Sequence, residues 1–338
     1  MVCQHGLRCA VQNCIGTRSF TVLEFVVRRI PRWRRVPRTR LDKNLNMSVT
    51  KTTPDPSSRS QQQVLSPILR LPGRVVRKAA SILRNCRWRF LGYDYLKIND
   101  TVRLKIHADS RIGHLLRYGD FEAAELTFLR RYLRPGDSFI DAGANVGLYT
   151  LLAGVLVGSS GRVFAFEPAS ATFRRLMENV RNSGLSQVSC HQMALSDAPG
   201  KGALSVSETG FDAWNSLAGS LTDGPTGTES VTLTTWDDFA KLNGVGNQIT
   251  AIKIDVEGWE LPVLTGMSRL LEQNDAPLLQ VEFTATNASA AGGSCEMLFD
   301  AIQRFGYQLY RFDSVSQTLA VQTAAPTEGH CKDRKSVV

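Results

Sequence analysis

The sequence predicts an α/β fold in which helices cover both faces of a mostly parallel, doubly wound sheet, preceded by a basic N-terminal extension. Between residues 138 and 305, short apolar segments of strand length alternate with helical patterns, as a parallel sheet requires. A glycine-rich turn directly follows the first of these strands. Residues 1–90 carry 19 Lys and Arg against 3 Asp and Glu, whereas residues 91–338 carry 21 against 28. The basic charge therefore belongs to the extension and not to the globular part.

Length and composition are those of a globular protein. The chain has 338 residues, of which 43% are hydrophobic, so it can bury a core without disulfides. Its seven cysteines show neither a CxxC pair nor zinc-type spacing, which favours reduced thiols and a cytoplasmic protein. The longest apolar run, Leu148–Val157, is about half of the ~18 residues that a membrane span needs. The Arg-rich start is typical of an organelle transit peptide, or would be untranslated if Met47 is the true start.

Four segments are expected along the chain. Residues 1–63 are predicted to be a disordered basic extension, and residues 64–90 an amphipathic basic helix that is clearest from Arg74 to Cys86. Such a helix could lie on a membrane surface. The favoured interpretation docks its apolar face on the globular domain and leaves its basic face in solvent. Residues 91–322 are predicted to form that domain, and residues 323–338 a disordered tail.

The elements of the domain follow in order. Residues 94–118 alternate apolar and polar as strands or a hairpin do, and residues 122–132 form a helix that Pro135-Gly136 ends. Strands are predicted at 138–143, 162–168, 188–195, 251–258 and 277–283, and helices at 146–157, 170–183 (with Ser170 as N-cap) and 296–305. Residues 201–235 add two alternating stretches around a polar loop at 210–228, which could form part of a substrate lid.

The glycine-rich turn is the strongest functional signal. It follows a strand, opens a helix, and lets the backbone approach a ligand closely. The dinucleotide fingerprint G-x-G-x-x-G is absent, and an acid begins the loop where a pyrophosphate would be disfavoured. An acid suits a ligand with a sulfonium and an ammonium, such as S-adenosyl-L-methionine. We assign the loop to that cofactor through Asp141, Gly143, Ala144, Asn145 and Gly147.

Two later positions complete the predicted cofactor site. Glu167 ends the next strand, 26 residues after Asp141, where a carboxylate can accept hydrogen bonds from both ribose hydroxyls. After the third strand, Ala194 and Leu195 could pack on an adenine ring, and Asp197 could accept from its amino group. Alternatively, these last three residues only end a strand and contribute an acidic side chain to the turn that follows, without binding adenine.

The order of these motifs resembles the FkbM family of class I S-adenosylmethionine-dependent methyltransferases. The resemblance covers about residues 118–312 and rests on GDSFIDAGANVGLYT, VFAFEP, ENVRNSGL, ALSD and AIKIDVEGWELPVLTG, of which KIDVEG is the most specific. It implies a Rossmann-like methyltransferase fold, cofactor binding by Asp141, Gly143, Asn145, Gly147 and Glu167, and O-methylation of a sugar, glycan or other natural product. Trp259 departs from the family pattern, and residues 1–90 have no counterpart in it.

Carboxylates at the ends of the later strands are the candidate catalytic groups. Asp255 ends one strand, Glu257 follows it, and Glu282 closes the next, so the three should converge near a methyl acceptor. We predict Asp255 to be the general base or to orient the acceptor hydroxyl, with Glu257 as second choice or as a helix cap. The spacing is no metal signature and no metal ligand is assigned, although a divalent cation is an alternative. Lys253 is assigned no catalytic part.

Rival functions make different demands on the sequence. A short-chain dehydrogenase needs its Tyr-xxx-Lys pair well after the glycine loop, but Tyr93 and Lys97 precede it. An amino-methylating enzyme of nucleic acids would carry Pro-Pro-aromatic where this chain has IDVEG, although the basic arm could contact RNA. A non-catalytic adenosine-binding module is the third alternative. The expected partner is a small hydroxylated acceptor, with weak membrane or nucleic-acid contact through the N-terminus and no obligate protein partner.

Overall fold

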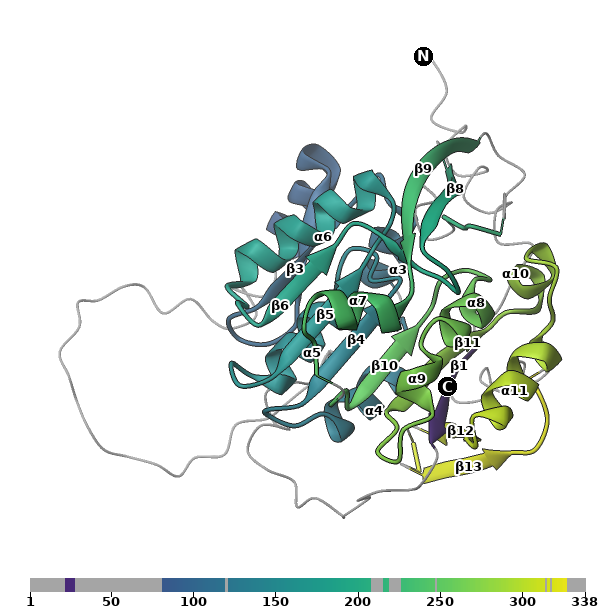
Figure 1. The fold of residues 1–338 in the computed structure, drawn as a ribbon. Coiled ribbons are helices and arrows are strands. Elements are labelled where there is room, and N and C mark those ends of the chain that lie inside the picture. Colours follow the sequence, from purple (N-terminus) through teal and green to yellow (C-terminus); the bar gives the residue numbers. More distant parts are fainter. Residues whose placement is uncertain are drawn as a thin grey trace, which may run out of the picture.

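A computed structural model shows a central eight-stranded sheet with helices on both faces (Figure 1). The strand order is β13-β12-β1-β11-β10-β4-β5-β6. The structure describes residues 22–27 (backbone only), 81–118, 121–207, 215–218, 226–246, 248–313, 315–316 and 318–326.

The central five strands are parallel, as predicted. They are β11 (Leu278–Phe283), β10 (Ala251–Ile254), β4 (Ser138–Ala142), β5 (Arg162–Phe166) and β6 (Val188–His191). The other three pair antiparallel: β1 (Val22–Val27), β12 (Gln308–Asp313) and β13 (Thr318–Gln322). Because parallel strands place their carboxyl ends at one edge, the turns after β4, β5, β10 and β11 lie together.

Strand β1 corrects one prediction about the N-terminal extension. Its residues belong to the segment 1–63 that the sequence predicts to be disordered, yet they lie in the sheet between β11 and β12. In register, Leu23 faces Glu282 of β11. The domain that was predicted to begin at residue 91 therefore includes six earlier residues. The rest of the segment lies outside the described residues.

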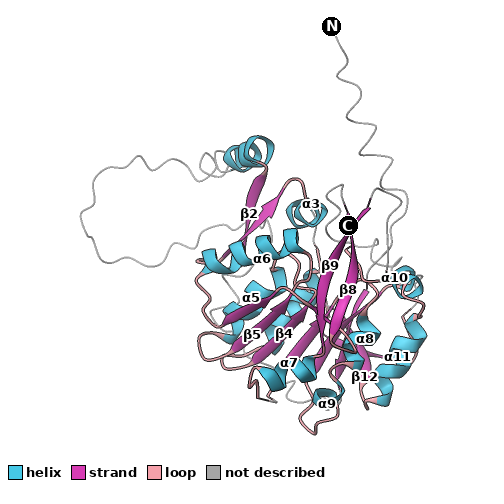
Figure 2. Ribbon diagram, turned by 45° about the horizontal axis from the view of Figure 1, so that its top comes forward, coloured by secondary structure: helices cyan, strands magenta, loops and turns pink. Residues whose placement is uncertain are grey.

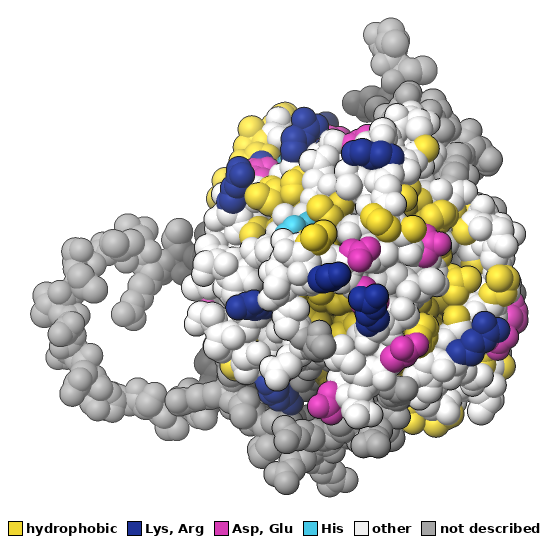
Figure 3. Space-filling view, viewed as in Figure 1, with side chains coloured by type: hydrophobic (Ala, Val, Ile, Leu, Met, Phe, Trp, Pro, Cys, Tyr) yellow, Lys and Arg dark blue, Asp and Glu magenta, His cyan; other side chains and the backbone are white. Residues whose placement is uncertain are grey.

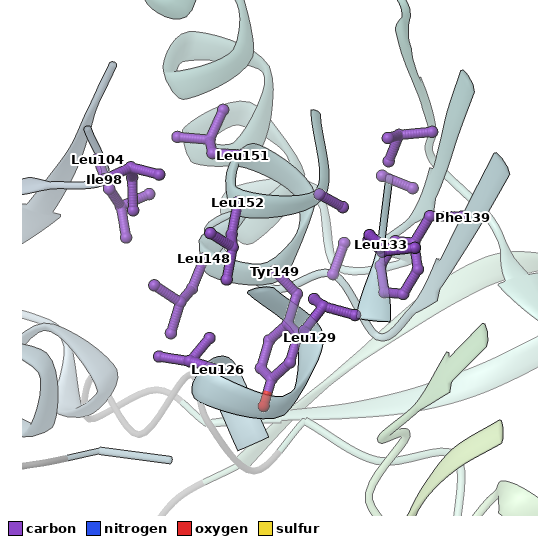
Figure 4. Close-up of a cluster of buried hydrophobic side chains, with 14 of the residues drawn as sticks. Ile98, Leu104, Leu126, Leu129, Leu133, Phe139, Leu148, Tyr149, Leu151 and Leu152 are labelled. Carbon is purple, nitrogen blue, oxygen red and sulfur yellow. The ribbon is translucent and has the colours of Figure 1, made fainter. Parts of the chain in front are cut away.

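Two hydrophobic cores explain why helices cover both faces of the sheet. Along β5, Val163 and Ala165 face one core, while Phe164 and Phe166 face the other, as the two-residue period of a strand requires. The first core contains residues of α4 (Ala123–Tyr132), α5 (Leu148–Val157) and α6 (Ser170–Ser183), and part of it is drawn in Figure 4. The second contains residues of α7 (Trp236–Leu242), α8 (Glu260–Thr265), α9 (Ser268–Leu271) and α11 (Cys295–Arg304). The short α10 (Ala285–Ala290) follows β11.

The predicted hairpin at 94–118 is partly right. β2 (Tyr93–Lys97) and β3 (Arg103–His107) pair antiparallel, but the following α3 (Arg111–Tyr118) is a helix. The buried Ile112 and Leu116 lie four residues apart, which is helical and not strand spacing. The hairpin docks on α6, because the backbone N–H of Lys105 donates to Asn179 Oδ1 at 2.8 Å.

The basic segment before β2 contradicts the favoured orientation of its helix. Residues 81–86 are helical and continue into the π-helical turn η2 (Arg87–Leu91). The predicted apolar face is exposed there, since Ile82 and Leu83 are 54% and 64% accessible. Two of its basic side chains, Arg84 and Arg87, make the contact instead, because they bind the fully buried Asp94. Arg117 of α3 binds the same carboxylate. Burying Asp94 required cations, so charge and not hydrophobicity set the docking face. The earlier part of the predicted helix lies outside the described residues.

The insertion at 201–235 forms a separate small sheet of order β7-β9-β8 (Figure 2). Its strands are β7 (Ala194–Leu195), β8 (Gly200–Ser207) and β9 (Thr226–Thr234). Ser170 is not the N-cap of α6, because Ala169 occupies that position; the backbone N–H of Ser170 instead donates to Glu229 of β9 at 3.1 Å. This contact fixes the small sheet beside the helix that follows β5.

No helix in the described ranges is long and apolar enough to cross a membrane. Residues 323–326 of the predicted tail follow β13, and the remainder of the tail lies outside the described residues.

Candidate active site

The glycine-rich turn adopts the strained backbone that its sequence predicts. Gly143 and Gly147 have φ values of +77° and +98°, and Asn145 has +48°, a left-handed conformation that non-glycine residues seldom adopt. The backbone N–H groups of Gly143 and Ala144 donate to the carbonyl of Phe166 at 3.1 and 2.9 Å. The loop that opens α5 is therefore fixed to the end of β5.

Gly143 also joins this loop to the strand that carries Asp255. A Cβ atom built at position 143 would lie 1.8 Å from the backbone oxygen of Asp255. No side chain fits there, so glycine allows the end of β4 and the end of β10 to touch. The predicted cofactor loop and the predicted catalytic carboxylate are in contact through their backbones.

Glu167 clamps the same loop. Its Oε2 accepts from the backbone N–H of Asn145 at 3.0 Å, and its Oε1 accepts from the N–H of Ala169 at 2.9 Å. Burial raises the pKa of Glu167 to about 7, although the two backbone hydrogen bonds oppose this rise. Each carboxylate oxygen keeps a second lone pair, so the side chain could still accept from a diol. Its role toward a ribose stays a prediction.

Asp141 is the penultimate residue of β4 and lies inside the molecule. It is fully buried, and its Oδ2 accepts from Thr150 Oγ1 at 2.5 Å. Its Oδ1 has no hydrogen-bond partner among the described residues, and Lys253 Nζ lies 3.8 Å away. Burial raises the pKa of Asp141, while Lys253 and Thr150 lower it. The group anchors the loop internally, and contact with a ligand stays a prediction.

The predicted adenine residues follow β6. Ala194 and Leu195 form β7 and are buried. Asp197 is exposed, and its Oδ1 accepts from Ser196 Oγ at 3.0 Å. Ser196 is buried and also accepts from the Trp259 indole N–H at 3.1 Å, so the departure at Trp259 has a structural role there. The structure is compatible with the predicted contacts of this group but does not test them.

Lys253 is central to the site, which the sequence interpretation missed. Its Nζ lies 2.9 Å from Asp255 Oδ2 and 3.1 Å from the carbonyl oxygen of Gly143. Burial would lower the pKa of Lys253, but Asp255, Asp141 and Glu122 raise it by more, so the side chain is held as a cation. The signal was available: residues 253 and 255 share one face of a strand, and Lys253 is the register partner of Asp141.

Glu257 occupies a strained turn next to Asp255. It has φ +54°, and its Oε2 accepts from Asn287 Nδ2 at 2.6 Å. Burial raises the pKa of Glu257 well above its usual range, and Asp255 raises it further. Its backbone carbonyl accepts from Ser216 Oγ at 2.6 Å, while most of the predicted lid at 210–228 lies outside the described residues. Glu257 does not cap the next helix, because Trp259 is the N-cap residue of α8 and no side chain caps that helix.

The three predicted carboxylates do converge. One oxygen each from Asp255, Glu257 and Glu282 lies within 4.8 Å of the others. Burial and the neighbouring acids raise the pKa of Glu282 well above its usual range. Two unit charges ~5 Å apart repel by about 3 kcal/mol at an effective dielectric of ~20. Lys253 alone, already shared with Asp141, does not balance three anions.

Glu122 adds a fourth acid to this cluster. It lies at the start of α4 with φ +49° and a buried, unpartnered Oε2. Burial and then Asp255 raise the pKa of Glu122 to about 8, while Lys253 and a hydrogen bond with Tyr149 lower it. The Tyr149 hydroxyl, which also accepts from Gln280 at 2.9 Å, lies beside the first hydrophobic core in Figure 4. The structure places Glu122 close enough to Asp255 for the two acids to interact electrostatically.

A glycine turn after β4, an acid after β5 and carboxylates at the ends of β10 and β11 are consistent with a class I methyltransferase architecture. The family profile described as the methyltransferase FkbM domain matches residues 141–309. The chain belongs to the FkbM methyltransferase family.

Individual relatives are more distant. "Methyltransferase 1" of Beauveria bassiana (strain ARSEF 2860) is 33% identical over 153 residues, which cover 39% of this chain and 59% of that protein. The chain thus matches less than two thirds of its relative's length. The solved methyltransferase FkbM from Methylobacillus flagellatus KT is 17% identical, covering 57% of this chain and 47% of that one, with a TM-score of 0.35. A SAM-dependent O-methyltransferase from Thermotoga maritima is 14% identical, covering 60% of each chain, with a TM-score of 0.30.

Proposed function

We propose that this protein transfers a methyl group from S-adenosyl-L-methionine to a hydroxyl of a sugar, glycan or other small natural product. The observation that carries the proposal is the backbone contact between Gly143 and Asp255, which joins a cofactor loop to a cluster of carboxylates. Family membership supports methyl transfer, and the carboxylates favour an acceptor that must lose a proton.

The residues present fit the cofactor. The loop from Gly143 to Gly147 and the carboxylate of Glu167 would hold it, and Asp141 keeps one buried oxygen without a hydrogen-bond partner in the described chain. Ala194, Leu195 and Asp197 would line the adenine. When bound, S-adenosylmethionine supplies a methyl carbon that breaks from sulfur as it bonds to the acceptor oxygen.

Asp255 would take the proton that the acceptor hydroxyl loses. Lys253 Nζ lies 2.9 Å from Asp255 Oδ2, which fixes the orientation of the carboxyl group. Glu257 would orient the acceptor from the adjacent turn. Ser216 Oγ donates to the backbone carbonyl of Glu257, so Ser216 would border the acceptor.

On the face seen in Figure 3, acidic and basic side chains of the described residues are interspersed and form no continuous basic band. A nucleic-acid acceptor would favour such a band.

The first test is calorimetric titration of the full chain with S-adenosylmethionine. We expect Glu167→Gln to weaken binding by tenfold or more, about 1.4 kcal/mol, and the exposed Glu272→Gln to leave it unchanged. Full-length protein that is folded but shows no binding would contradict the proposal. With binding established, hydroxylated sugars are screened for a mass gain of one methyl group, and Asp255→Asn should remove that gain while cofactor binding persists.

A further inference from the structure

We propose that Asp255, Glu257 and Glu282 bind one divalent cation of the magnesium or manganese class beside the acceptor. The inference rests on the proposed function for its chemical purpose, but it is carried by the geometry of the carboxylates. The three come from two neighbouring strand ends, and each offers an oxygen within 4.8 Å of the other two. Two oxygens bound to one ion at about 2.0–2.2 Å lie at most about 4.4 Å apart, so these side chains would turn slightly inward to hold it.

Glu282 supplies the second, independent observation. It is 2% exposed, and its Oε1 accepts from Thr284 Oγ1 at 2.9 Å. Its Oε2 is buried and has no hydrogen-bond partner among the described residues. The carboxyl group lies against that of Asp255. A buried polar atom without a partner indicates a missing ligand, and next to other carboxylates that ligand must be cationic or a proton donor.

The surroundings favour a cation over further hydrogen bonds from the chain. Lys253 is the cation in contact with Asp255, but its Nζ is directed at Asp255 Oδ2 and the Gly143 carbonyl, and it is shared with Asp141. Asn287 donates to only one oxygen of Glu257. Glu122 adds another buried oxygen without a partner in the described chain. The cluster thus presents an excess of negative oxygen ligands.

The donor set selects the kind of ion. All three ligands are carboxylates, and within this trio there is neither a sulfur nor an imidazole ligand, so a hard cation fits better than zinc or copper. Magnesium and manganese commonly use a few carboxylates and complete their coordination with water or substrate. The remaining positions would receive the acceptor hydroxyl, whose pKa the ion lowers. Asp255 would then accept the proton and hold the ion together with its neighbours.

The test measures binding of Mn²⁺ to the full-length protein by the loss of the free-ion paramagnetic resonance signal. We expect one saturable site, displaced by Mg²⁺. Glu282→Gln and Asp255→Asn should each weaken Mn²⁺ binding by tenfold or more, and Glu272→Gln should not. Circular dichroism and cofactor titration of each variant establish that it is folded.

Absence of saturable binding up to millimolar Mn²⁺ would overturn the proposal and leave a shared proton between Asp255 and Glu282. Unchanged affinity in both Glu282→Gln and Asp255→Asn would also overturn it. If Glu282→Gln does not fold, the Asp255→Asn result decides alone. Activity separates the two proposals: methyl transfer that persists in EDTA, together with no Mn²⁺ binding, rejects the cation and keeps the transferase. A bound ion without transfer to any hydroxyl rejects the acceptor class and keeps the ion.

Discussion

The two halves of the site satisfy their carboxylates in opposite ways. On the cofactor side, both oxygens of Glu167 accept from backbone N–H groups, at 3.0 and 2.9 Å. On the acceptor side, Asp255, Glu257 and Glu282 lie within 4.8 Å of one another, and one oxygen of Glu282 has no partner in the described chain. Glu167 is satisfied without a ligand, although Asp141 in the same half keeps one oxygen without a partner in the described chain, whereas the second half is electrostatically incomplete.

This difference shows how each half is determined. Local backbone geometry builds the cofactor half, since a glycine turn and the acid after the next strand bring their own hydrogen bonds. The acceptor half depends on groups that meet only when β4, β10 and β11 are side by side. Lys253 lies where the two halves meet, between Asp141 and Asp255.

The largest effect is expected from Lys253→Met. The change removes the cation that Asp141 and Asp255 share and leaves two acids near one another, one of them fully buried. Removing one partner of a buried ion pair costs about 3–5 kcal/mol. Urea unfolding of the full chain at pH 7.5 measures the loss.

The exposed Lys241→Met is the matched control and should change the unfolding free energy by less than about 0.5 kcal/mol. A loss of stability in Lys253→Met as small as in this control would mean that the two halves are electrostatically independent. Cofactor binding in the same variant sharpens the comparison, because Lys253 also donates to the Gly143 carbonyl.

Sequence patterns predicted the elements that carry the proposed cofactor half. Strand β4, the turn at Gly143, helix α5 and strand β5 follow from apolar runs, glycines and helix signals within about 30 residues. The convergence of Asp255, Glu257 and Glu282 also followed, because carboxyl ends of parallel strands share an edge.

Long-range contacts were less accessible to sequence reasoning. Nothing in the segment 1–63 indicated that β1 would join the sheet, because six residues of strand pattern inside a basic, Pro- and Ser-containing segment resemble a linker. The helical segment at residues 81–86 docks by its basic face because the buried Asp94 needs cations. Asp94 lies outside the helical pattern from which the docking face was predicted. Charge compensation of this kind depends on partners that a periodicity pattern does not identify.

A proline in β1 should have the next largest effect. Phe25 pairs with Gln280 of β11 on one side and Tyr310 of β12 on the other, so its N–H lies within the ladder. Phe25→Pro removes that donor in an interior strand, at about 3 kcal/mol or more. Thermal unfolding measures the loss, with Phe25→Ala as the control that keeps the N–H.

The same variant separates the two halves. Because β1 lies beside β11, which carries Glu282, Mn²⁺ binding should weaken more than cofactor binding at β4 and β5. Equal costs for the alanine and proline variants would show that the ladder is not the reason for the loss.

The smallest expected effect concerns the pH dependence that Glu122 brings to the acceptor half. Its pKa is raised to about 8 in the folded protein from 4.5, so the folded state holds this proton more tightly. Its contribution to stability is fully present below pH 4.5 and is lost as the pH rises through about 8.

The variant Glu122→Gln cannot lose a proton at this position. One pKa unit corresponds to about 1.4 kcal/mol. Because the charge of Asp255 contributes to the raised pKa of Glu122, the gain should be smaller than the full shift, and we expect the variant to gain on the order of 2 kcal/mol over the wild type between pH 5 and pH 9. Urea unfolding in EDTA at both pH values measures this gain, with Glu272→Gln as control. Parallel pH profiles for the wild type and Glu122→Gln would mean that the pKa of Glu122 is not raised in the folded protein.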